Sequence, residues 1–267
     1  MNFRRRLTLT LALAGLVMVP GALLGADDDH KDEGSSASCK GLPSHAELKT
    51  QLKAARIAAN GGFNLDMWAT VVNRDGIVCA VAFTGTDRGD QWPGSRVISA
   101  QKANTANAFS LPGLALSTAN LYTAVQPGGS LFGLQESNPV NVSLAYRGNS
   151  ANYGQTNDPM VGGKIGGVNV FGGGLALYNS AKELIGGIGA SGDSSCADHN
   201  IAWRTRRGLN LDYVPAGVSG QPTRKDNIVY DITNAPGLGI GVSAGGWGHA
   251  ACAAAATALS LTLPPTR

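Results

Sequence analysis

Residues 241–245 read Gly-Val-Ser-Ala-Gly, the G-x-S-x-G spacing that carries the serine nucleophile of many hydrolases, and His249 follows shortly after. In that class an acidic residue and then a histidine follow the serine, separated by long stretches of chain. Here no acidic residue occurs after Asp231. The order of the residues therefore disfavours a serine hydrolase.

Residues 187–192 read Gly-Ile-Gly-Ala-Ser-Gly, the G-x-G-x-x-G dinucleotide fingerprint, and Asp212 lies about 20 residues beyond them, as in that motif. Dinucleotide binding requires a strand, a helix and a second, parallel strand. The strand expected here belongs to an antiparallel hairpin. We therefore expect the glycines to permit a sharp turn at a strand end, before a helix capped by Asp193 or Ser194. The first amides of that helix could still receive an anionic group.

Four cysteines form an even set without any C-x-x-C pair: Cys39, Cys79, Cys196 and Cys252. In an oxidising compartment such a set favours two disulfides over a zinc site or a thiol nucleophile. Three pairings are possible, and the sequence cannot choose among them. Our working expectation is Cys39–Cys79 and Cys196–Cys252, which would tie both ends of the chain to its core.

The first 26 residues have the layout of a secretory signal peptide: three arginines, an apolar stretch over 7–19, and then Pro20-Gly21 before small residues. An uncleaved anchor is the alternative, because residues 7–24 approach the length needed to cross a bilayer. We expect cleavage near Ala26, followed by an acidic linker over 27–42. The protein would then be periplasmic or extracellular.

The charge of the chain resides in that leader. The full sequence has 267 residues, a net charge of +3, 15% charged residues and 37 glycines. The leader holds three of the 21 basic residues and no acidic residue, so 18 basic and 18 acidic residues remain after its removal. A neutral chain without a basic cluster, apart from a helix end at 204–207, disfavours nucleic acid and, after cleavage, a membrane surface as partners.

Hydrophobic periodicity and capping signals predict an α+β domain, in which an antiparallel sheet of two hairpins packs with helices. Its helices should begin at Ser44, which forms a capping box with Glu47, at Ser99, at residue 117 and at 193–194. The strands should cover 67–72, 77–83, 167–178 and 183–190. A long loop over 126–164, rich in Gly, Asn, Ser, Pro and Tyr, and a tail over 209–267 show no confident element.

The hairpin around 72–76, the Lys-Ala-Asn-Thr-Ala segment at 102–106 and the Ile-Gly-Gly-Ile-Gly-Ala-Ser-Gly-Asp segment at 185–193 resemble the GlcG/HbpS family of haem-binding proteins, which includes the C-terminal domain of PduO-type proteins. The resemblance covers about residues 44–208, the core of a single domain over 43–267. It implies a compact α+β fold, a homo-oligomer, and binding of haem or another tetrapyrrole. The inserted loop, the cysteines and the tail suggest an exported subgroup.

If the resemblance holds, the iron needs a side-chain donor, most often histidine. His45, at a first helix turn, and His199, beside Asp198, are the candidates for haem iron, and Asp198 or Asp193 could fix the tautomer of His199. Lys102 and Arg204 are candidate partners of the haem propionates. The tryptophans could stack on the macrocycle, although most aromatic residues belong to the core.

The function that follows from this resemblance is an exported haem- or tetrapyrrole-binding protein that sequesters, carries or senses its ligand. Two alternatives remain open. The chain could be an enzyme that degrades haem or acts on a small metabolite. It could also be a non-catalytic exported domain that uses residues 126–164 to bind a partner.

Overall fold

The structure is a computed structural model that describes residues 38–234, 239 and 241–267. The predicted signal peptide over 1–26, His30 and the linker as far as residue 37 lie outside the described residues. None of the described helices is long and apolar enough to span a bilayer. The fold below is that of the folded unit that follows the leader.

Two hairpins form one four-stranded antiparallel sheet in the order β2-β1-β4-β3. Its strands are β1 Trp68–Asn73, β2 Val78–Phe83, β3 Gly174–Tyr178 and β4 Leu184–Ser191. Each hairpin was expected from its alternation of β-favouring runs and turn residues. The chain joins them side by side, because β1 pairs with β4 along its whole length, from Trp68↔Ser191 to Asn73↔Gly186.

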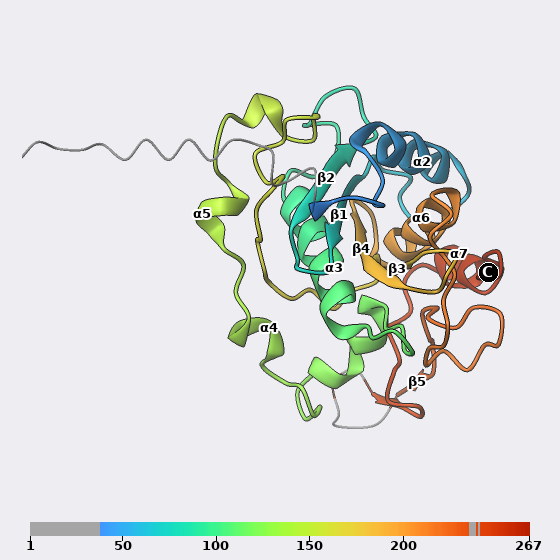
Figure 1. Cartoon of the computed structure of the whole chain (residues 1–267). Helices are drawn as coiled ribbons and strands as arrows, with labels where there is room; N and C mark the ends of the chain where they lie inside the picture. The colour runs from blue at the N-terminus through green and yellow to red at the C-terminus, as the bar shows by residue number, and fades with distance from the viewer. Residues whose placement is uncertain (1–37, 235–238, 240) are drawn as a thin grey trace, which may run out of the picture. The chain divides into compact units, whose positions relative to one another are not determined.

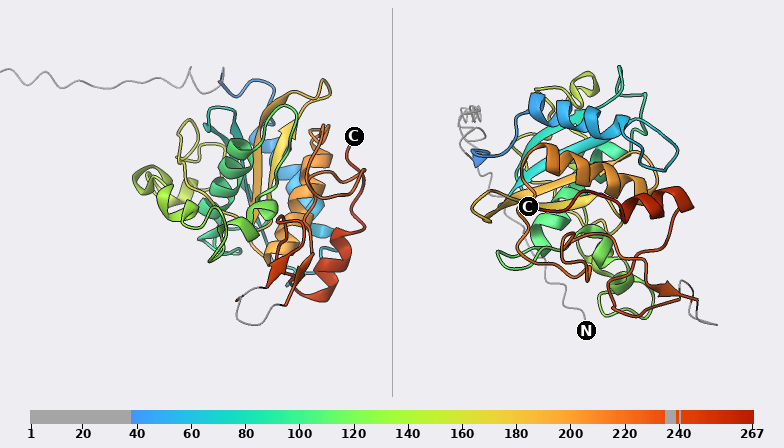
Figure 2. Two further views of the ribbon diagram at one scale, coloured as in Figure 1. Left: turned by 90° about the horizontal axis from the view of Figure 1, so that it is seen from below. Right: turned by 90° about the vertical axis from the view of Figure 1, so that its right-hand side faces the viewer.

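Three helices cover the two faces of the sheet. Helix α3 (Ser95–Phe109) packs on β4, β1 and β3 from one side, whereas α2 (His45–Ile57) and α6 (Ser195–Gly208) pack against each other and cover the other side (Figures 1 and 2). The capping box of Ser44 and Glu47 is present at the start of α2. Ser194 caps α6 by accepting a hydrogen bond from the Ala197 amide. The predicted α+β architecture is thereby confirmed.

Helix α3 begins four residues before Ser99, so the expected cap at Ser99 is wrong. The Ser99 hydroxyl lies inside the helix, where it bonds the carbonyl oxygen of Arg96 at 2.7 Å and the Thr70 hydroxyl at 2.7 Å. Serine commonly caps helices, but in a helix interior it can bond a carbonyl of the preceding turn instead. The tertiary contact with Thr70 on β1 could not be read from local sequence.

Apolar residues fill both faces of the sheet. On one face, Leu48 and Leu52 of α2 and Ile201 of α6 meet Val71 and Ile188 of the sheet. The second face packs strand residues against α3 and the inserted segment; it includes Trp68, Val81, Phe83, Val97, Ala100, Ala145 and Met160. Because both faces are covered, every residue of β1 is buried.

The glycines of β4 allow α3 to approach the strand backbone closely. A Cβ atom at Gly189 would lie 2.0 Å from the carbonyl oxygen of Ser99, and one at Gly187 would lie 2.4 Å from that of Ala103. No larger residue fits at either position without displacing the helix. The G-x-G-x-x-G match at 187–192 is therefore a packing feature of an antiparallel strand.

Before the inserted segment over 126–164, the chain forms η1 Thr118–Leu121 and η2 Thr123–Val125. The inserted segment and the tail contain further short elements that the sequence did not reveal: α4 Leu134–Ser137, α5 Val142–Ala145, η3 Ser150–Asn152, β5 Ile232–Thr233, β6 Val242–Ser243 and α7 Ala254–Ser260. The short helix expected at 117–125 is thus a pair of 3-10 turns. The tail is ordered by packing, since Ile228 and Ala256 form a buried cluster with Ala119 and Cys196.

Both expected disulfides are present. Cys39 bonds Cys79 on β2, and Cys196 on α6 bonds Cys252 in the tail. No cysteine remains free. The second bond joins the tail to the start of α6, and the first joins the residues before α2 to an edge strand of the sheet.

Candidate functional site

His45 lies on the first turn of α2, partly buried, and its side chain reaches the inserted segment. Its Nε2 atom is 2.9 Å from the carbonyl oxygen of Gly154. Because a carbonyl oxygen can only accept, Nε2 carries the proton and the lone pair of the neutral ring resides on Nδ1. A ring N–H donated to a backbone carbonyl is the usual second contact of a metal-ligating histidine.

An aromatic cavity of about 240 Å³ lies next to this contact. Eight residues line what we call the aromatic cavity: Trp68, Arg88, Pro93, Gly94, Arg96, Val97, Tyr146 and Tyr153. Gly154, which accepts the hydrogen bond from His45, directly follows Tyr153. A Cβ atom at Gly154 would lie 2.3 Å from the Phe83 ring and 2.7 Å from the Trp68 ring, so the backbone rests on this aromatic pair.

Arg96 forms one side of the aromatic cavity, but its charge is paired with a buried carboxylate of the protein itself. Its Nε atom donates to Asp158 at 2.8 Å, Nη1 donates to the Ala145 carbonyl at 2.7 Å, and the guanidinium stacks on Tyr153 at 3.6 Å from the ring centroid. Both Arg96 and Asp158 are almost fully buried. The pair therefore fastens the inserted segment to α3 and leaves no net charge.

The sequence did not point to the aromatic cavity. Its residues come from β1, the loop after β2, the start of α3 and the inserted segment, which lie far apart along the chain. The only feature of the sequence that pointed toward it was the presence of tyrosines in the long loop over 126–164. Proximity of such separated residues depends on the way the segment folds back over α3.

His199 occupies a different environment, in the interior between α6 and the tail. The side chain is fully buried, and its Nε2 atom lies 3.1 Å from Asn227 Oδ1 and 3.2 Å from the amide nitrogen of Ile228. Burial lowers the pKa of His199 to about 3, so the ring is neutral. Its partner is thus Asn227, whereas we had expected Asp198 or Asp193 to orient it.

Lys102 is buried as an ion pair. Its Nζ atom lies 2.7 Å from Asp198 Oδ2 and 3.2 Å from the Ala190 carbonyl oxygen, and both side chains are nearly inaccessible. Burial raises the pKa of Asp198 to about 6 despite the lysine. The ion pair joins α3 to α6 across the end of β4, so the lysine charge already has a partner.

Arg204 lies on α6 near a second, polar cavity. Its guanidinium donates to Asn60 Oδ1 at 3.2 Å and to the Ala59 carbonyl at 3.3 Å. The four candidate haem-site residues are therefore not gathered at one place. His45 contacts the inserted segment, Arg204 contacts the loop after α2, and Lys102 and His199 lie in the interior.

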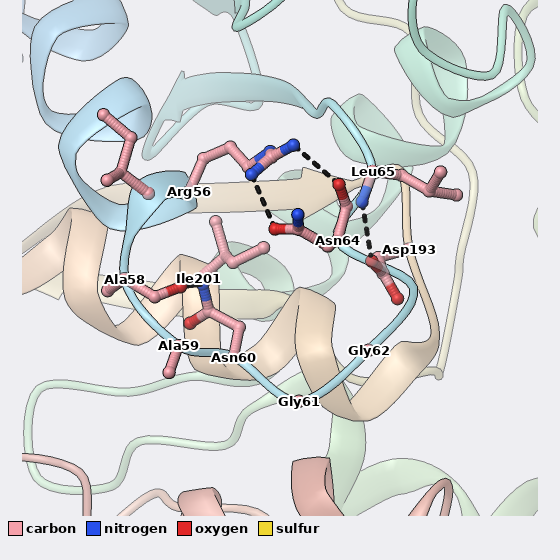
Figure 3. A pocket seen from close by; sticks show the side chains of 11 residues that line it. Arg56, Ala58, Ala59, Asn60, Gly61, Gly62, Asn64, Leu65, Asp193 and Ile201 are labelled. Atoms are coloured by element: carbon pink, nitrogen blue, oxygen red, sulfur yellow. Dashed lines mark hydrogen bonds between the residues drawn. The ribbon is translucent and has the colours of Figure 1, made fainter.

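The polar cavity measures about 330 Å³ and is bounded by residues 56–62, Asn64, Leu65, Asp193 and Ile201 (Figure 3). The Arg56 guanidinium donates two hydrogen bonds to Asn64, from Nη1 to the side-chain oxygen Oδ1 at 2.7 Å and from Nη2 to the backbone carbonyl oxygen at 2.6 Å. Asp193 accepts the amides of Phe63 at 2.9 Å and Leu65 at 3.1 Å. Most of the hydrogen bonds of these two charged side chains therefore go to the loop itself, and they stabilise its shape.

The serine-hydrolase pattern does not form a catalytic pair. Ser243 Oγ donates to Asp231 at 2.7 Å and accepts from the Gly248 amide at 3.0 Å. His249 accepts the Gly172 amide on Nε2 at 3.3 Å and donates from Nδ1 to the Ala250 carbonyl at 2.7 Å. Both imidazole nitrogens of His249 are therefore occupied by backbone groups, and neither contacts Ser243.

Metal clusters are also missing from the part of the chain that the structure describes, where no three His, Cys, Asp or Glu side chains are placed to hold an ion. Of the three described histidines, only His45 combines partial exposure with an uncommitted ring nitrogen. Among the described histidines, His45 is therefore the one that an iron could reach without a rearrangement of the interior.

Comparison with known proteins shows which family the chain belongs to and which solved structures it resembles. No curated protein matches the chain. Among solved structures, protein ORFY of Klebsiella pneumoniae is 24% identical, covering 62% of this chain and 90% of that one, with a TM-score of 0.41. The PduOC–haem complex is 24% identical (63% and 96% covered, TM-score 0.43). A double mutant of Streptomyces reticuli HbpS is 16% identical (73% and 97% covered, TM-score 0.39).

The family described as "Haem degrading protein HbpS-like" matches residues 44–206. The matched region begins at the cap of α2 and ends in the last turn of α6, so it contains the whole four-stranded sheet and its three covering helices. It makes up more than half of the 267 residues. The chain therefore belongs to the HbpS-like family.

Proposed function

We propose that this protein binds haem, or a closely related tetrapyrrole, outside the cytoplasm. Membership of the HbpS-like family over residues 44–206 is the observation that carries the proposal. The two disulfides support export, because such bonds persist in oxidising compartments. In that setting a neutral, disulfide-linked domain would sequester or carry its ligand.

His45 is the side chain of this structure best suited to hold the iron. Its hydrogen bond to Gly154 leaves the Nδ1 lone pair free and orients the ring, and the side chain is partly exposed. Haem supplies an iron centre that takes an axial nitrogen ligand. The residues around His45 therefore fit the group, because a partly exposed imidazole lies beside a cavity lined by aromatic side chains.

His199 is the second candidate ligand and fits less well. Its imidazole is fully buried and Nε2 is held between Asn227 and Ile228, so an incoming iron would have to separate α6 from the tail. Arg204, which is partly exposed, could meet a propionate more readily than Lys102, because Lys102 is neutralised by Asp198.

Titration of the mature protein with hemin tests the proposal. We expect a saturable, shifted Soret band at micromolar protein. His45→Ala and His45→Gln should each weaken hemin binding at least about tenfold, as loss of a metal ligand or of its support commonly does. The glutamine variant is the sharper one, because it can still donate to Gly154 but offers no imidazole nitrogen.

His199→Gln serves as the matched comparison. Its hemin affinity should equal that of the unaltered protein if His45 is the ligand. A hemin affinity that falls in His199→Gln and not in the His45 variants would transfer the role to His199. An unaltered protein whose mixture with hemin shows only the spectrum of free hemin would refute haem binding altogether.

Haem degradation is a second candidate function, favoured because the family is described as haem degrading. Under air and with a reductant such as ascorbate, degradation would appear as progressive loss of the Soret band with release of iron. A Soret band that persists unchanged would assign the protein to sequestration or carriage.

A further inference from the structure

We propose that the disulfide between Cys196 and Cys252 is a redox switch, which a dithiol reductant opens and whose reduction frees helix α7 to separate from α6. The other disulfide, Cys39–Cys79, is in this view a permanent structural bond. The switch is independent of the ligand that the protein binds.

Hydrogen-bond donors converge on the sulfur atom of Cys252. Its Sγ atom accepts the backbone amide of Cys196 at 3.2 Å and lies 3.5 Å from the Ser195 hydroxyl. The hydroxyl must be the donor in that contact, because a disulfide sulfur carries no hydrogen. Both donors lie in the first turn of α6, a helix of 14 residues whose N-terminal end favours negative charge. After reduction the same donors stabilise Cys252 as a thiolate.

The Cys39–Cys79 bond has a different environment. Cys79 Sγ lies 3.5 Å from the carbonyl oxygen of Ile77, a group that accepts hydrogen bonds but cannot donate one to a thiolate. Of the polar contacts that the described residues make with these two sulfur atoms, none comes from a backbone amide. A disulfide becomes easier to reduce when its reduced form is stabilised. The contacts therefore favour reduction of Cys196–Cys252 before Cys39–Cys79.

Access to the switch determines the order of the exchange steps. Cys252 is partly exposed and Cys196 is fully buried, so a thiolate of the dithiol attacks Cys252 Sγ. A mixed disulfide forms as the Cys196–Cys252 bond breaks, and the electron pair goes to Cys196 Sγ, which takes up a proton. The Ala250 carbonyl oxygen, 3.8 Å away, can accept the new S–H. The second thiol of the dithiol then displaces Cys252 as a thiolate, and the dithiol leaves as its own disulfide.

Helix α7 depends on its packing against α6, because its seven residues are too few for a stable isolated helix. Asn200 of α6 donates to the Ala256 carbonyl at 3.1 Å and accepts from the Ser260 hydroxyl at 2.8 Å. The same Asn200 side chain donates to the Asn60 carbonyl at 3.0 Å, in the loop after α2 that borders the polar cavity. A Cβ atom at Gly61 would lie 2.4 Å from the Ala256 nitrogen, so α7 rests on that loop. Loss of the covalent link therefore loosens both α7 and the loop after α2.

Equilibrium reduction of the mature protein tests the two bonds side by side. The protein is incubated at graded ratios of reduced to oxidised dithiothreitol and alkylated, and mass spectrometry of its peptides gives the reduced fraction of each cysteine pair. We expect Cys196–Cys252 to be half reduced at a ratio about tenfold lower than Cys39–Cys79, because a hydrogen bond to a charged group contributes about that factor. Half reduction of both bonds at the same ratio, or in the reverse order, would overturn the proposal.

Ser195→Ala removes one donor to the switch and leaves all four cysteines in place. The ratio for half reduction of Cys196–Cys252 should rise about threefold to tenfold in this variant, and that of Cys39–Cys79 should stay the same. Ser180→Ala is the matched control, since Ser180 is an exposed serine in the turn between β3 and β4. It should shift neither bond. A Ser195→Ala protein that behaves like this control would refute the role of the donors.

Hydrogen exchange shows whether reduction opens the structure. At a dithiothreitol ratio that reduces only Cys196–Cys252, amides of α7 and of the loop after α2 should exchange at least about tenfold faster than in the oxidised protein, whereas those of β1 should keep their protection. Unchanged exchange in α7 would show that the bond can be reduced without acting as a switch.

Discussion

At the scale of single residues, burial decides which titratable groups can meet a ligand. His45, His199 and His249 have the same chemistry, yet only His45 lies at the surface with a free ring nitrogen. His199 accepts the amide of Ile228 in the tail, and His249, itself in the tail, accepts the amide of Gly172 before β3, so both histidines join the tail to the rest of the fold. Their neutral state is the reason that they can be buried at all, because an imidazolium in the interior would be poorly solvated.

Acidification should destabilise the fold through the two buried histidines. Burial lowers the pKa of His199 to about 3 and that of His249 to about 4, below the ordinary value of 6.5. Between about pH 6.5 and pH 4 these histidines are therefore protonated in the unfolded chain but remain neutral in the folded protein. The free energy of unfolding falls as the pH falls through this range. Each histidine should lower the free energy of unfolding by about 2 kcal/mol between pH 7 and pH 5.

Asp198 acts in the opposite direction, because burial raises its pKa to about 6 and the folded protein binds that proton more readily than the unfolded chain. Urea unfolding at pH 5, 6 and 7 checks the balance. His249→Gln should reduce the loss of stability between pH 7 and pH 5 by about 2 kcal/mol. An unchanged pH dependence in that variant would show that His249 is not a neutral buried group.

At the scale of elements, the contact between α3 and β4 has the least tolerance for change. The carbonyl oxygens of α3 lie directly over strand glycines, so the helix and strand approach without intervening side chains. This explains why the α3 segment is rich in small residues and why glycine recurs in β4.

Gly189→Ala should destabilise the protein by about 3 kcal/mol, at the upper end of the usual cost of overpacking, because its Cβ would be placed 2.0 Å from the Ser99 carbonyl oxygen and 2.6 Å from the Ala103 nitrogen. Gly113→Ala is the control, since nothing lies within 4 Å of a Cβ at that position. Thermal and urea unfolding of both variants measure the difference. Equal stability of the two would mean that α3 moves away from the strand at little cost.

The elements that the sequence predicted are those with strong local signals. The Ser44–Glu47 capping box and the turn at 73–76 each involve residues close together in the chain, and each is present in the structure. The start of α3 was wrong because Ser99 finds its partner on β1. The short turns of the inserted segment and the tail had no periodic pattern to reveal them.

At the scale of the folded unit, long-range bonds anchor residues 126–164 and the tail over 209–267. Arg96 and Asp158 hold the inserted segment, Arg206 and Asp226 hold the tail, and Cys196–Cys252 adds a covalent link. Such buried pairs are costly to break by removal of one partner. They hold residues 126–164 against α3 and the tail against α6.

Removal of the second disulfide should loosen the tail selectively. Its cysteines are 56 residues apart, and a disulfide of such spacing contributes about 2–4 kcal/mol to stability. We expect Cys196→Ala/Cys252→Ala to unfold at lower urea concentration and to be cleaved by proteases within residues 209–267. Cys39→Ala/Cys79→Ala should leave the tail resistant. Equal tail cleavage in the two variants would contradict this assignment.

The sequence by itself determined the α+β class, the two hairpins, the helix caps at Ser44 and Ser194 and the family resemblance, because these depend on periodicity and on residues close in the chain. It also offered His45 and His199 as candidate iron ligands without any means of ranking the two. Only the tertiary structure decided which histidine is accessible, that Lys102 is neutralised, and that Trp68, Arg88 and Tyr153 share a cavity. Those properties depend on burial and on contacts between distant segments, which local sequence patterns do not encode.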